Sequence, residues 1–74
     1  MKATLALRKV MEIRGVKPAV LCDRIDIKAN VLSERFRQEN ISVAKLNEML
    51  KAMDYKIIVV PRDVRVPDGG FDIE

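Results

Sequence analysis

The chain contains no histidine, no tryptophan and a single cysteine, and these absences exclude most kinds of active site. Without histidine there is no Ser–His or Cys–His pair for nucleophilic catalysis, and one cysteine cannot build a structural zinc site. The only paired glycines, Gly69-Gly70, follow Pro67-Asp68 near the end of the chain, so there is no phosphate-binding glycine loop. We therefore expect no enzymatic activity, no cofactor and no metal.

The 74 residues also offer no disulfide bond and few aromatic side chains to stabilise a core. The lone Cys22 has no partner for an internal disulfide, and one tyrosine and two phenylalanines are the only aromatic residues. The core must therefore consist of aliphatic side chains, in a domain so small that packing alone is marginal. We expect a second copy of the chain to supply part of the missing stability.

No apolar run approaches the roughly 18 residues that are needed to span a bilayer. The N-terminal stretch is interrupted by Arg8, Lys9 and Glu12, whereas a signal peptide keeps its hydrophobic segment free of charge. The pattern instead predicts an amphipathic first helix. A cytoplasmic protein with no membrane partner is the expectation that follows.

Apolar residues recur at helical spacing through most of the chain. They predict four helices, over residues 4–14, 17–25, 28–38 and 42–53. Gly15 ends the first helix, Pro18 falls in the first turn of the second, and Ser42 is a typical N-cap for the fourth. Asp26 takes the turn between the second and third helices, where it can adopt a left-handed backbone. Residues 1–54 are thus expected to form one mainly α-helical domain.

The apolar pattern changes after the fourth predicted helix. Residues 55–60 are rich in β-forming side chains and stop at Pro61, which predicts a strand. Because a single strand cannot satisfy its own backbone, it must pair with the tail or with the same strand of a second copy. We prefer the second copy, with a dimer interface of Tyr55, Ile57, Ile58, Val59 and Val60. Residues 61–74 form either a short hairpin or a frayed tail.

Residues 16–37 have the pattern of a helix-turn-helix. Two short amphipathic segments flank Asp26, and the second carries polar and charged side chains opposite its apolar residues. In this motif the second helix lies in the major groove of DNA. The charge distribution agrees, because residues 1–37 hold nine Lys or Arg and four Asp or Glu, a net charge of +5. Residues 38–74 hold five and seven, a net charge of −2.

The stretch from Leu7 to about Met53 resembles the Cro and lambda-repressor type of helix-turn-helix regulators, also called XRE-like. Asp26 stands at the usual glycine of the turn in that family. Val31 takes the place of a Thr, Ser or Val in the recognition helix, and Leu32 takes that of an Ile or Leu. The same stretch is similar to small phage and mobile-element regulators, which often continue into a strand. Here the predicted strand replaces the fifth helix that the family normally adds.

The resemblance implies which residues contact DNA. The expected base contacts are Ala29, Asn30, Ser33 and Glu34. The expected phosphate contacts are Lys17, Lys28, Arg35 and Arg37. Asn30 has the side chain that pairs with adenine, and Glu34 can accept a hydrogen bond from cytosine or repel phosphates. The alternative is that both are solvated residues of a surface helix.

Together these features predict a sequence-specific transcriptional regulator that represses by occupying an operator as a homodimer on double-stranded DNA. The dimer would place two recognition helices about 34 Å apart. The main alternative is a protein-interaction module on the same fold, such as an antitoxin or an inhibitor of another protein. A nonspecific architectural DNA binder is a second alternative, but such proteins are usually more basic.

Overall fold

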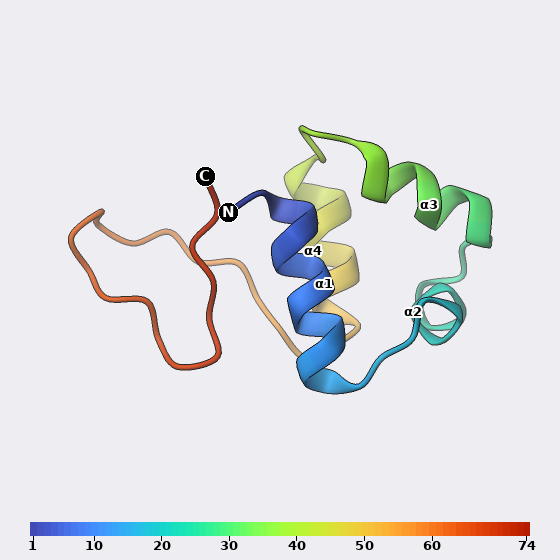
Figure 1. Ribbon diagram of the computed structural model, residues 1–74, viewed down its shortest axis with the longest axis horizontal. Helices are drawn as coiled ribbons and strands as arrows, with labels where there is room; N and C mark the ends of the chain where they lie inside the picture. Colours follow the sequence, from blue (N-terminus) through green and yellow to red (C-terminus); the bar gives the residue numbers. More distant parts are fainter.

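The computed structural model describes all 74 residues, and its regular structure consists of four helices (Figure 1). They are α1 (Ala3–Arg14), α2 (Pro18–Ile25), α3 (Ala29–Arg37) and α4 (Val43–Lys51). The mainly α-helical class with four helices is therefore confirmed. None of these helices has both the length and the apolar character that crossing a membrane requires.

The helix ends follow from local chemistry. Gly15 closes α1 with φ 64°, and its amide and that of Val16 donate to carbonyls of the last turn. Asp26 closes α2 in the same left-handed region, with φ 55°, as predicted for this turn. Ser42 caps α4, because its Oγ accepts a hydrogen bond from the Lys45 amide at 3.2 Å. Lys28 precedes α3 without a side-chain cap, so this helix begins less firmly than α4 does.

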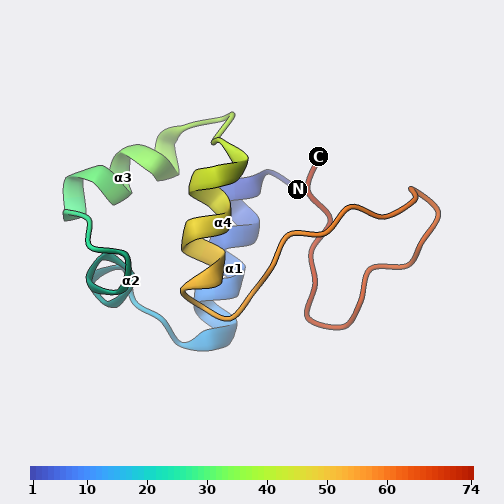
Figure 2. The same cartoon turned by 180° about the vertical axis from the view of Figure 1, so that it is seen from behind.

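The four helices are arranged as two pairs, α1 with α4 and α2 with α3. Helices α1 and α4 lie side by side, and α2 and α3 pack beyond them (Figures 1 and 2). The Arg24 guanidinium donates to the Ala52 carbonyl at 3.0 Å and so ties α2 to the end of α4. The candidate recognition helix α3 therefore lies at the edge of the domain, with much of its surface free.

A single aliphatic cluster holds these parts together, as the scarcity of aromatic residues predicted. Leu7, Leu21 and Met49 are completely buried, and they come from α1, α2 and α4. The other members of the cluster are Val10, Met11, Val16, Cys22, Leu32, Leu46, Leu50 and Met53. No buried polar side chain interrupts it. Burial of each large aliphatic side chain stabilises the fold by about 1.5–3 kcal/mol.

The strand predicted at residues 55–60 is not formed. Within the chain no backbone amide or carbonyl of residues 56–60 makes a hydrogen bond to another backbone group. A strand needs such a neighbour, and the tail does not supply one because it turns away at Pro61 and again at Pro67. β-Propensity alone therefore gave the wrong secondary structure for an isolated chain.

The tail is neither the short hairpin nor the frayed end that the sequence predicted as alternatives, because it returns to the helices and is held there by four contacts. The Tyr55 hydroxyl donates to the Gly69 carbonyl at 2.8 Å, and Phe71 packs against the core. The N-terminal ammonium of Met1 donates to the Asp72 carbonyl, and the Glu74 amide donates to the Met1 carbonyl, both at 3.0 Å. The two ends of the chain consequently lie together (Figure 1).

The left-handed turn at Asp26 gives a prediction about stability. Replacing Asp26 by glycine removes the steric cost of this backbone conformation, and the exposed Asp26 side chain makes no hydrogen bond that would be lost. We expect Asp26→Gly to raise the free energy of unfolding by about 0.5–1 kcal/mol in urea titrations. Asp23→Gly, an exposed position inside α2, is the matched control and should lower it by a few tenths of a kcal/mol. A lower stability for Asp26→Gly would contradict this account.

Candidate functional site

The polar face of α3 is the candidate site. Ala29, Asn30, Ser33 and Glu34, the predicted base contacts, are all exposed on this one helix. The opposite face holds Leu32, which is 3% exposed, and the partly buried Phe36. Burial of these two apolar residues decides which side of α3 faces outward. The structure thus brings the four predicted side chains together on one accessible surface.

A polar hollow runs beside this face, between α3 and the first turn of α4. Its volume is about 500 Å³, and Val31 is the only hydrophobic residue that lines it. The other lining residues are Asn30, Ser33, Glu34, Arg35, Arg37, Gln38 and Lys45. The hollow therefore combines hydrogen-bonding side chains with one carboxylate, that of Glu34, and three cationic side chains. Cations and hydrogen-bonding groups are what contact phosphates and base edges.

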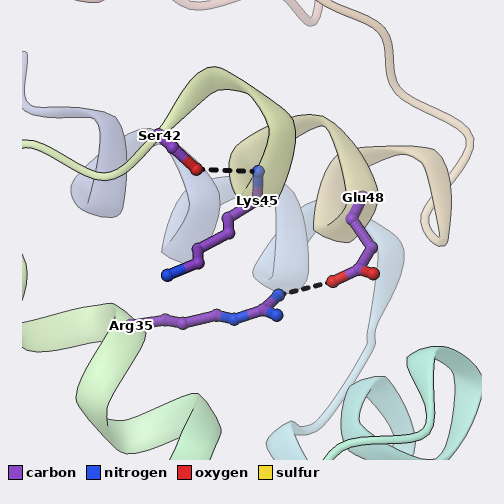
Figure 3. A network of polar contacts seen from close by, with 4 residues as sticks. All are labelled: Arg35, Ser42, Lys45 and Glu48. Carbon is purple, nitrogen blue, oxygen red and sulfur yellow. Dashed lines mark hydrogen bonds and ion pairs between the residues drawn. The ribbon is translucent and has the colours of Figure 1, made fainter.

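Lys45 is a member of this site that the sequence analysis did not identify. It lies in the first turn of α4, and Figure 3 shows its side chain reaching toward α3, next to Arg35. Lys45 forms no ion pair, so its ammonium group is available to an anion in the hollow. No local pattern marks this residue, because its closeness to α3 depends on how α4 packs.

The predicted phosphate contacts lie in different surroundings. Lys17 and Lys28 are exposed at the N-terminal ends of α2 and α3, and neither forms an ion pair. Arg37 is exposed and lies 3.8 Å from the Glu34 carboxylate, one turn earlier on the same helix. These three cations are therefore accessible to a phosphate backbone, although Arg37 also forms an exposed ion pair with Glu34.

Arg35 differs from the other predicted phosphate contacts. Its guanidinium donates to the Glu48 carboxylate of α4 (Figure 3), at 2.6 Å. The Arg35 side chain is only 12% exposed. The charge that the sequence analysis assigned to phosphate is thus already engaged within the domain.

The segment predicted as a dimer interface is a second exposed feature. Tyr55 and Ile57 pack partly against the core, whereas Ile58, Val59 and Val60 are exposed. Val59 is 97% exposed, which is unusual for so apolar a side chain. Because the backbone of this segment is also unpaired, both its side chains and its peptide groups are accessible to a partner.

Compared with known proteins, the chain matches no protein-family model, no curated protein and no solved structure. The resemblance to XRE-like regulators therefore stays a prediction. What the chain does is inferred from its residues and their placement.

Proposed function

We propose that the chain is a sequence-specific DNA-binding regulator that inserts α3 into the major groove and represses by occupying an operator. The observation that carries this proposal is the outward face of α3, where Asn30, Ser33 and Glu34 stand together beside a hollow that Arg37 and Lys45 line. Three features agree with it: the short turn at Asp26, the edge position of α3, and the positive charge of residues 1–37.

The exposed side chains of α3 suit direct recognition of bases. The Asn30 amide can donate to N7 of adenine and accept from N6 of the same base. Such a paired contact contributes about 1–3 kcal/mol of discrimination against other bases. Glu34 can accept from N4 of cytosine, and Ser33 can bond to several bases. The Ala29 methyl group can pack on the methyl group of thymine. The four residues therefore cover more than one kind of base edge.

Cations on either side of this face would contact the sugar-phosphate backbone. Lys17 and Lys28 stand at the N-terminal ends of their helices, where the helix dipole also favours an anion. Pro18 has no amide to offer at the start of α2, so Lys17 takes a larger share of that contact. Arg37 and Lys45 flank the hollow on the other side.

We further propose that the regulator is a dimer formed by antiparallel pairing of residues 55–60 across a two-fold axis. Pairing would satisfy the amides and carbonyls of every second residue among residues 56–60 and would cover part of the apolar surface of Ile58, Val59 and Val60. The strand that is missing from the single chain would then form between two chains.

The function is tested by selecting binding sites from random duplex DNA and sequencing the retained fraction at several salt concentrations. We expect a palindromic site with half-sites about one helical turn apart. Weak, salt-sensitive binding without enrichment would contradict the proposal. It would instead favour the protein-interaction alternative, for which the exposed Leu5 and Ile13 of α1 and the segment 58–60 offer apolar surface.

Asn30→Ala and Lys45→Gln should change binding in different ways. Loss of the Asn30 amide should reduce affinity for the selected site about 5- to 150-fold and relax preference at one position. Loss of the Lys45 charge should weaken binding to all sequences and lower the slope of log K against log salt by about 0.9. Fluorescence anisotropy with the selected and a scrambled duplex measures both effects. Lys51→Gln, an exposed charge at the far end of α4, is the control and should leave the slope unchanged.

The dimer interface is tested by Ile58→Pro. The Ile58 amide makes no backbone hydrogen bond within the chain, so proline should leave the helical domain folded while it prevents pairing between chains. We expect a monomer in sedimentation equilibrium, with reduced affinity for the palindrome. Ile58→Val, which keeps the amide, should remain dimeric. A dimeric Ile58→Pro variant would rule out the strand contact.

A further inference from the structure

Helix α3 is attached to the rest of the domain by few contacts. Leu32 is its only buried residue, whereas α1 and α4 bury four and three residues respectively. Its N-terminal end is held by the short turn after α2 but has no side-chain cap. Near its C-terminal end, Phe36 is partly buried and has the Arg8 guanidinium 4.4 Å from its ring centre. Leu32 and Phe36 are thus the apolar contacts of α3, and neither is directional.

The Arg35–Glu48 pair supplies a directional contact at that C-terminal half. Of the three ion pairs in the structure, it alone joins α3 to another helix, and its N–O distance of 2.6 Å is the shortest. The Arg35 side chain is 12% exposed and that of Glu48 is 47% exposed, so water screens this pair less than a surface pair. The Lys2–Glu39 pair, by contrast, has both side chains at least 70% exposed.

We infer that Arg35 is a positioning residue, which holds α3 against α4 through Glu48 at the angle that base contact requires. This inference rests on the proposed function, and it replaces the direct phosphate contact expected of Arg35. The pair lies five residues after Asn30, which is about 7.5 Å along the helix axis. A tilt of α3 about Leu32 would therefore move Asn30 as well as Arg35, although the Asn30 side chain forms no hydrogen bond with either partner.

The pair also neutralises Glu48 beside the hollow. An unpaired carboxylate at this position would repel phosphate, so removing Arg35 alone would change both the helix angle and the local charge. A variant that removes both partners leaves the net charge of the chain unchanged. It therefore tests only whether the pair holds α3 in position. The double variant R35M/E48Q does this and keeps an unbranched apolar side chain in place of the Arg35 stem.

Two measurements on R35M/E48Q test the inference in the 74-residue chain. The first is amide hydrogen exchange, in which residues 33–37 should exchange faster than in the wild type while α1 stays protected. The second is binding to the selected duplex and to a scrambled one. We expect the ratio of the two affinities to fall at least about ten-fold, the size of one lost base contact, with an unchanged salt slope. The matched control K2M/E39Q removes the exposed pair and should change neither measurement.

Each other result overturns the inference in a recognisable way. Unchanged exchange in α3 would mean that the pair does not hold the helix. Faster exchange with an unchanged affinity ratio would mean that the angle of α3 does not matter for base contact. An unchanged ratio with a salt slope lowered by about 0.9 would return Arg35 to a phosphate contact. A wild-type chain without any sequence preference would overturn the proposed function and this inference together, whereas unchanged exchange overturns the inference alone.

Discussion

The burial of Leu32 is the interaction on which the candidate site depends. It is the one fully buried side chain of α3, and together with the partly buried Phe36 it decides which face of that helix is exposed. Burial of a leucine contributes about 1.5–3 kcal/mol, a large share of the stability of so small a domain. Because this contact is apolar, it holds the helix down without specifying its angle. Directional polar contacts such as Arg35–Glu48 are therefore needed beside it.

The C-terminal segment, unlike Leu32, leaves its apolar side chains in solvent. Residues 58–60 expose apolar side chains, and the backbone of residues 56–60 is unpaired, so the segment gains little from its present position. The tail beyond it is nevertheless anchored, through Tyr55, Phe71 and the chain ends. An exposed segment held between two fixed points is already ordered in part, which lowers the entropic cost of pairing with a partner. This is the physical basis for the proposed dimer contact at residues 55–60.

The local features of the fold could be predicted because short-range chemistry determines them. Gly15 and Asp26 end their helices in left-handed conformations, and Ser42 caps α4 through its own hydroxyl. Each of these effects involves residues within about one turn of each other, so sequence spacing is sufficient to find them. The outward placement of Asn30 and Glu34 was predictable for the same reason, since helical periodicity sets them opposite Leu32.

Sequence alone therefore determined the four helices, the helix ends at Gly15, Asp26 and Ser42, the aliphatic core and the exposed face of α3. Only the tertiary structure decided the partners of residues that are distant in the chain. The placement of α4 relative to α3 engages Arg35 with Glu48 and brings Lys45 to the hollow, although periodicity does not distinguish these two cations. The path of the tail likewise left residues 55–60 without a strand partner, despite their β-forming composition. Side-chain pairing and strand formation both depend on a neighbour in space, whereas helix formation depends on neighbours in sequence.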